Sequence, residues 1–113
     1  MHELSLALEV IGLAQREAGK NGVSAIREIL IEVGDLSGVE ADSFQWGLEM
    51  LVKGTILEDA VVNLIRTPGK GKSCGCNIEF EMKTRLDVCP ECQCFPSGIT
   101  GGKEFRVVSM LAE

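Results

Sequence analysis

The sequence predicts an α+β fold, in which a small mixed β-sheet is flanked by two helices and carries an inserted zinc-ribbon-like module. Apolar side chains recur at helical spacing in residues 4–18 and again in residues 40–53. Residues 26–33, 60–65 and 105–111 are rich in β-branched and aliphatic side chains, which is typical of strands. All five cysteines fall between the second and third of these strands, so the module interrupts the sheet-forming part of the chain.

The first predicted helix begins within a few residues of the start of the chain. The glycine-rich segment 19–22 ends it. In the second helix, Ser37 or Asp42 is the candidate N-cap. Trp46 lies off the apolar stripe of this helix, and we expect it to be buried in the core. The alternative is that it contacts the neighbouring module or a partner. The inner face of the first helix is formed by Leu4, Ala7, Ile11, Ala14 and Ala18.

Composition limits the classes of function. The chain has 113 residues, of which 45% are hydrophobic and only 4% aromatic, so its core is expected to be aliphatic. Its formal net charge of -6 disfavours binding to phosphate backbones, and we expect no nucleic-acid partner. No apolar run approaches the roughly 18 residues of a membrane helix, and no secretory leader is recognisable. We therefore expect no membrane association and a cytoplasmic location.

The cysteines form two close clusters, Cys74-Gly75-Cys76 and Cys89-Pro90-Glu91-Cys92-Gln93-Cys94. Two pairs of thiolates separated by a short loop are what a tetrahedral zinc site needs. A disulfide framework is the alternative, but an odd number of cysteines and their close spacing favour a metal. Any four of the five thiols could bind, and Cys94 is the expected spare.

Two glycine-rich segments bracket the cysteines. Residues 67–72 and 97–102 have the composition of linkers. We therefore expect an α/β domain formed by residues 1–69 and 98–113, and a zinc-binding module formed by residues 70–97.

The start of the chain is a second candidate metal site. His2 is the only histidine, and it follows the terminal residue Met1 directly. The Met1 amine, the His2 amide nitrogen and the His2 imidazole can close adjacent chelate rings on one cation, and such nitrogen donors suit Ni(II) or Cu(II). Glu3 can add an oxygen. The alternative is a solvated terminus with no ligand.

No catalytic apparatus is recognisable in the sequence, so we expect no enzyme. The phosphate-loop and dinucleotide patterns do not occur, and the single histidine cannot serve both a terminal chelate and a catalytic triad. A closed thiolate site and an open nitrogen-rich site together favour metal handling. The alternatives are a zinc-ribbon adaptor without nickel transfer and a redox-regulated enzyme that uses Cys94.

Four motifs resemble those of the HypA/HybF family of nickel metallochaperones, which act in NiFe-hydrogenase maturation. They are Met-His-Glu-Leu-Ser-Leu-Ala at residues 1–7, Glu-Val-Gly-Asp-Leu-Ser-Gly-Val-Glu at residues 32–40, Lys-Gly-Thr at residues 53–55, and the paired cysteines. The likeness covers nearly the whole chain, and the motifs occur in the family's order. The first cysteine pair departs from the family's Cys-x-x-Cys pattern, because Ser73 stands where the other cysteine is expected.

The resemblance implies a function and a set of ligands. Nickel is the transported cargo, bound through Met1, His2 and Glu3, with Glu40 as a further candidate for support of the site. It also implies delivery with a hydrogenase-maturation nickel GTPase to the hydrogenase large subunit, a link to urease maturation proteins, and a monomer or weak homodimer. Structural Zn(II) is implied at four of the cysteines. These are Cys74, Cys76, Cys89 and Cys92, with Cys94 as the alternative ligand.

Overall fold

The computed structural model describes residues 2–113, which divide into two compact units. One unit takes in the chain up to Ile31 together with Glu40–Ile65 and Arg106–Glu113. The other takes in Glu32–Val39 and Arg66–Phe105. Among the described residues, no helix combines the length and the apolar character needed to cross a membrane.

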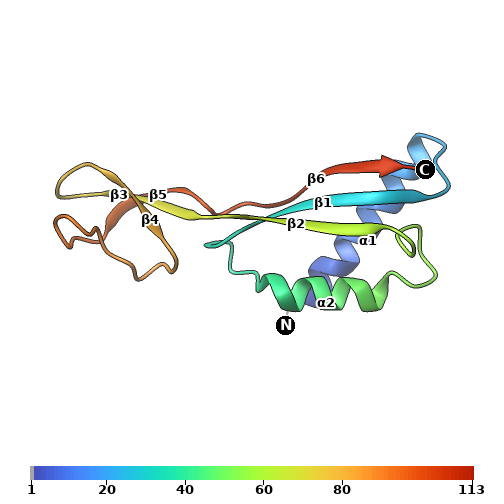
Figure 1. Ribbon diagram of the computed structural model, residues 1–113, viewed down its shortest axis with the longest axis horizontal. Helices are drawn as coiled ribbons and strands as arrows, with labels where there is room; N and C mark the ends of the chain where they lie inside the picture. Colours follow the sequence, from blue (N-terminus) through green and yellow to red (C-terminus); the bar gives the residue numbers. More distant parts are fainter. Residues whose placement is uncertain (1) are drawn as a thin grey trace. The chain divides into compact units, whose positions relative to one another are not determined.

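The first unit contains both helices and most of a three-stranded sheet, as the sequence predicts (Figure 1). The strands have the order β2-β1-β6, so the first strand in the sequence is central and the last one lies at an edge. Both helices lie on the same side of this sheet. The elements are α1 (His2–Lys20), β1 (Ile26–Gly34), α2 (Ala41–Leu51), β2 (Val61–Thr67) and β6 (Phe105–Ala112).

The core of the first unit lies between the helices and the sheet. Helix α1 buries residues at three- and four-residue spacing, which places them on one face of the helix. Leu4, which was predicted to lie on this inner face, is instead 43% exposed and packs beside α2. A Cβ atom on Gly47 of α2 would lie 2.9 Å from Leu4 Cδ2, so the glycine makes room for this approach. The buried apolar residues of α1 are Ala7, Val10, Ile11, Ala14 and Ala18.

Trp46 is exposed, so the prediction that it is buried was wrong. Its side chain is 65% accessible, whereas Phe44 and Leu48 are fully buried. Successive helical residues are about 100° apart, so Trp46 lies about 200° from each of these two core residues and faces away from the sheet.

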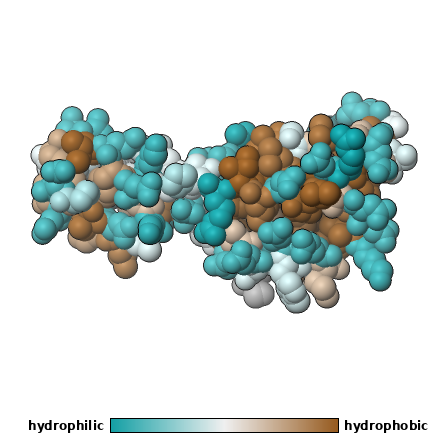
Figure 2. Space-filling view, in the orientation of Figure 1, coloured by the Kyte–Doolittle hydropathy of each residue, from teal (hydrophilic) through white to brown (hydrophobic). Residues whose placement is uncertain are grey.

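The first unit also carries apolar side chains at its surface. Figure 2 shows them gathered over the strands of its sheet. The large apolar residues of these strands that are exposed are Val61, Ile65, Val108 and Leu111.

The second unit is built on a smaller antiparallel sheet. Its strands are β3 (Gly69–Ser73), β4 (Glu79–Met82) and β5 (Pro96–Gly101), in the order β4-β3-β5. The glycine-rich segments at 67–72 and 97–102 are therefore largely strands, and the prediction that they are linkers was wrong.

The glycines of β3 make room for neighbouring atoms, which explains why this strand has the composition of a linker. A Cβ atom on Gly69 would lie 2.5 Å from both Leu36 Cγ and the Met82 carbonyl oxygen, and one on Gly71 would lie 2.5 Å from Met82 Sδ. Only glycine allows these neighbours to approach the strand so closely. The resulting core of the second unit contains Leu36, Phe80, Met82 and Cys89, with Cys92 and Ile99 packed against it.

Candidate metal centres

Three cysteines of the second unit form a compact group. The sulfur atoms of Cys76, Cys89 and Cys92 all lie within 4.8 Å of one another, and those of Cys76 and Cys89 are 3.5 Å apart. A tetrahedral zinc ion with Zn–S bonds of about 2.3 Å separates its sulfurs by about 3.8 Å. The arrangement therefore fits a zinc ion bound by three thiolates.

Ser73 is directed into the same group from the end of β3. Its side chain is 1% exposed, and its Oγ lies 2.9 Å from Cys92 Sγ. The backbone amides of Gly75 and Cys76 donate hydrogen bonds to this oxygen, at 3.1 and 3.3 Å. The Ser73 hydroxyl lowers the pKa of the Cys92 thiol to about 6, because a hydrogen bond to sulfur favours the thiolate.

The two remaining cysteines lie beside this group. Cys74 is exposed and is not one of the three clustered residues. Cys94 lies close to Cys92 and Cys74. A hydrogen bond with Cys92 and the charges on these two neighbours raise the pKa of the Cys94 thiol to about 11. A Cβ atom on Gly75 would lie 3.0 Å from Cys92 Sγ and 3.1 Å from Cys94 Sγ, so both sulfurs rest against the glycine backbone.

The segment that leads to the second pair of cysteines is held by backbone hydrogen bonds. Asp87 Oδ2 accepts from the amides of Lys83, at 2.7 Å, and Thr84, at 3.4 Å, and the Lys83 bond is the main reason for the lowered pKa of Asp87. Arg85 donates to the carbonyl oxygen of Leu36 at 3.0 Å. These contacts fix the turn between β4 and Cys89 within the second unit.

The candidate nickel residues lie at the start of α1. Met1 lies outside the described residues. His2 Nε2 lies 4.0 Å from Glu3 Oε2, and the His2 side chain is 59% exposed, whereas that of Glu3 is 17% exposed. The backbone amide of Glu40 donates to Glu3 Oε2 at 3.2 Å, and it is the main cause of the lowered pKa of the Glu3 carboxyl. The structure thus brings Glu3 and Glu40 together.

Glu40 is the N-cap of α2. Its Oε1 accepts a hydrogen bond from the amide of Asp42 at 3.1 Å, so the expected caps Ser37 and Asp42 were wrong. A glutamate can cap a helix here because its side chain bends back to the first turn of its own helix.

A pocket of about 430 Å³ opens beside Glu3. It lies in the first unit, and the exposed indole of Trp46 forms part of its wall. Its lining residues are Glu3, Leu4, Asp42, Ser43 and Trp46.

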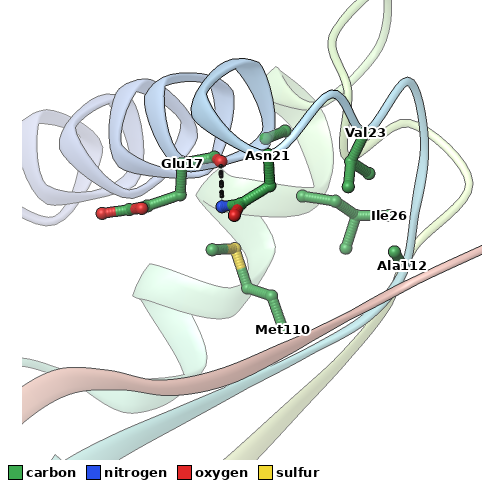
Figure 3. Close-up of a pocket in the computed structure, with 7 residues that line it drawn as sticks. Glu17, Asn21, Val23, Ile26, Met110 and Ala112 are labelled. Carbon is green, nitrogen blue, oxygen red and sulfur yellow. Dashed lines mark hydrogen bonds between the residues drawn. The ribbon is translucent and has the colours of Figure 1, made fainter.

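A second pocket, of about 230 Å³, lies at the other end of α1 (Figure 3). There the Asn21 side-chain amide donates to the carbonyl oxygen of Glu17 at 2.8 Å, which satisfies a carbonyl at the end of the helix. Val23, Ile26 and Met110 also line this pocket, and it holds no cluster of metal ligands among the described residues.

The fold and the thiolate group define a small α+β protein of the metal-binding class. Residues 1–112 match the family model described as "Hydrogenase/urease nickel incorporation, metallochaperone, hypA". The chain therefore belongs to the HypA family of nickel-incorporation metallochaperones, as its motifs predict.

Relatives and solved structures agree with this assignment. The hydrogenase maturation factor HypA of Parabacteroides distasonis is 35% identical over 98% of this chain and 96% of its own length. That of Geobacter metallireducens is 34% identical over the full length of both chains. The solution structure of the Ni metallochaperone HypA from Helicobacter pylori matches with a TM-score of 0.66 and 26% identity, over the whole of both chains.

Proposed function

We propose that this protein binds Ni(II) at its N-terminus and delivers it, together with a partner GTPase, to the large subunit of NiFe-hydrogenase. The match of residues 1–112 to a family of nickel-incorporation proteins is the observation that carries the proposal. The hydrogenase maturation factors among its relatives favour hydrogenase as the recipient. Because the family description also names urease, urease maturation proteins are the second class of partner.

Nickel is bound in this proposal by the Met1 amine and by the amide and imidazole nitrogens of His2, with Glu3 beside them. The exposed imidazole of His2 supports this role, since cargo must be able to enter and leave. The hydrogen bond from Glu40 to Glu3 ties the first turn of α1 to the start of α2. Glu40 thus supports the site by positioning Glu3, while its own carboxylate caps α2.

Zinc is structural in this proposal. Cys76, Cys89 and Cys92 supply thiolates, which zinc prefers, and Cys89 is fully buried in the core of the second unit. A soft sulfur site and an exposed nitrogen site select different ions, so resident zinc and transported nickel are kept apart.

Elemental analysis of nickel-loaded protein after gel filtration tests the proposal. We expect one nickel and one zinc per chain in the wild type. His2→Ala should lose nickel and keep zinc, and Cys89→Ser is the matched variant that should lose zinc. Wild-type protein that retains zinc but no stoichiometric nickel would contradict the proposal and favour a zinc-ribbon adaptor.

A further inference from the structure

We propose that zinc in this protein is coordinated by three thiolates and one oxygen, with Ser73 as the fourth ligand and with Cys74 and Cys94 outside the coordination sphere. This inference rests on the structural zinc of the proposed function and identifies its ligands. It differs from the set of four cysteines that the family resemblance implies.

The two turns that hold the cluster have the same backbone hydrogen bond. In the first turn, the amide of Ser73 donates to the carbonyl oxygen of Ile78 at 2.8 Å. In the second turn, the amide of Cys89 donates to the carbonyl oxygen of Cys94 at 3.0 Å. Each bond joins the first residue of a turn to the residue five positions later, so Ser73 is the counterpart of Cys89.

The turns also share an unusual backbone conformation at the same position. Asn77 and Gln93 have φ values of 64° and 61°, and they are the only non-glycine residues with positive φ in the part of the chain described. Each directly follows a clustered cysteine, Cys76 in the first turn and Cys92 in the second. A left-handed residue is uncommon outside glycine, so its recurrence makes the correspondence of the turns specific.

This correspondence assigns the ligand positions. Cys76 and Cys92 occupy the second ligand position of their turns, and Cys89 occupies the first position of its turn. Ser73 stands in the equivalent first position. The spacing is the same in both turns, because Ser73 precedes Cys76 by three residues and Cys89 precedes Cys92 by three.

The same correspondence between the two turns excludes Cys74 and Cys94 as zinc ligands. Cys74 is the counterpart of Pro90, which has no donor atom in its side chain. Cys94 is the counterpart of Ile78, which follows the left-handed residue and has an apolar side chain. Because neither Pro90 nor Ile78 can be a zinc ligand, the equivalent positions of Cys74 and Cys94 are not ligand positions.

The environment of Ser73 is that of a ligand position. Its side chain is 1% exposed and its oxygen faces Cys92 Sγ at 2.9 Å, so it is directed into the cluster. The amides of Gly75 and Cys76 donate to this oxygen, at 3.1 and 3.3 Å, which holds it at the cluster. Because a neutral hydroxyl has two lone pairs, zinc would take the one that accepts the longer bond, from Cys76, and the bond from Gly75 would remain. Zinc would replace the direct contact between Ser73 Oγ and Cys92 Sγ. Tetrahedral coordination would widen the distance between these two atoms to about 3.6 Å.

An oxygen at this position changes the chemistry of the ion. Three thiolates and a neutral hydroxyl leave the zinc centre with one negative charge fewer than four thiolates would. Because zinc prefers thiolate to a neutral alcohol as a ligand, replacing the hydroxyl by a thiol should hold the ion more tightly. The native site should therefore release zinc to a chelator faster than a Ser73→Cys variant does.

X-ray absorption at the zinc edge of the full chain, purified under reducing conditions, tests this inference. The wild type, Cys74→Ser and Cys94→Ser should each show three sulfurs at about 2.3 Å and one oxygen at about 2.0–2.2 Å. Ser73→Cys should show four sulfurs and should transfer zinc more slowly to a chromogenic chelator. The two cysteine variants are matched controls, because each alters one neighbouring thiol without changing Ser73.

Four sulfurs in the wild type, reduced to three by Cys74→Ser or by Cys94→Ser, would overturn the inference and leave structural zinc intact. A wild-type protein that binds no zinc, even when the ion is added, would overturn both the inference and the zinc part of the proposed function. If Ser73→Cys does not fold, the wild type and the two cysteine variants still decide between three sulfurs and four.

Discussion

The backbone amide of Glu40 donates a hydrogen bond to Glu3 Oε2 across 3.2 Å, which joins the first turn of α1 to the start of α2. The two residues are 37 positions apart in the sequence. Glu3 is adjacent to His2 in the sequence, so this contact anchors the segment that carries the proposed nickel ligands.

The Glu3–Glu40 bond predicts a pH dependence of stability. The bond lowers the pKa of Glu3 in the folded state below the ordinary glutamate value of about 4.3. Its contribution to stability is therefore fully present above that value and is lost as the pH falls through the lower folded-state pKa. Glu3→Gln, which carries no charge, should be less stable than the wild type at neutral pH. Urea unfolding at several pH values should show this difference shrinking in acid, and a constant difference would contradict the prediction.

Glu40 should act mainly as a helix cap. Glu40→Ala removes the oxygen that accepts from the Asp42 amide, and we expect it to lower the free energy of unfolding by about 1 kcal/mol. Glu40→Asp, with a side chain favoured at N-caps, should recover most of this loss. Thermal unfolding and nickel titration of both variants distinguish the helix-capping role of Glu40 from a role in nickel binding. A large loss of nickel affinity in Glu40→Asp, with stability unchanged, would instead indicate that the Glu40 carboxylate is a nickel ligand.

Zinc removal should loosen the second unit selectively. Thiolate coordination contributes folding free energy, and the predicted module of residues 70–97 has only a small core of its own. Complete chelation should increase amide hydrogen exchange across residues 74–94 and leave exchange in α1 and α2 nearly unchanged. Unchanged protection of residues 74–94 in zinc-free protein would show that zinc is not structural.

The glycines of β3 should be intolerant of a side chain. Gly69→Ala places a Cβ atom 2.5 Å from the Met82 carbonyl oxygen, and we expect a loss of about 1–3 kcal/mol in the free energy of unfolding. Gly98→Ala in β5 is the matched control, because a Cβ atom there meets nothing within 4 Å. Denaturant titrations of both variants measure the contrast. Equal effects would mean that close packing does not explain the glycine at position 69.

Much of the fold could be predicted from periodicity. Both helices and the strands of the first unit follow from regular burial patterns, as the buried Ala7, Ile11 and Ala14 of α1 illustrate. Strands β3 and β5 could not be predicted this way, because composition does not distinguish a flexible glycine from one that makes room for a neighbour. Gly69, which packs against Leu36, is such a case.

The sequence predicts the two candidate metal sites to different extents. The cysteine spacing indicates a metal site, and Cys76, Cys89 and Cys92 do come together. The place of Ser73 in that group depends on a match between two backbone turns, for which the spacing Ser-x-x-Cys is the only sequence signal. The Glu3–Glu40 contact depends on how α1 packs on α2, and no local pattern in the sequence encodes it.

The central claim is that nickel binds through the terminal amine and His2. Calorimetric titration of Ni(II) into zinc-loaded wild type, His2→Ala and a variant with one residue added before Met1 tests it most directly. His2→Ala removes the only imidazole in the chain, so its affinity should fall by more than the roughly 10–100-fold that loss of an outer-shell partner costs a metal site. The extended variant should also bind more weakly, because its amine no longer stands beside His2, and zinc content should stay constant in all three. Equal nickel affinity in the three proteins would contradict the account.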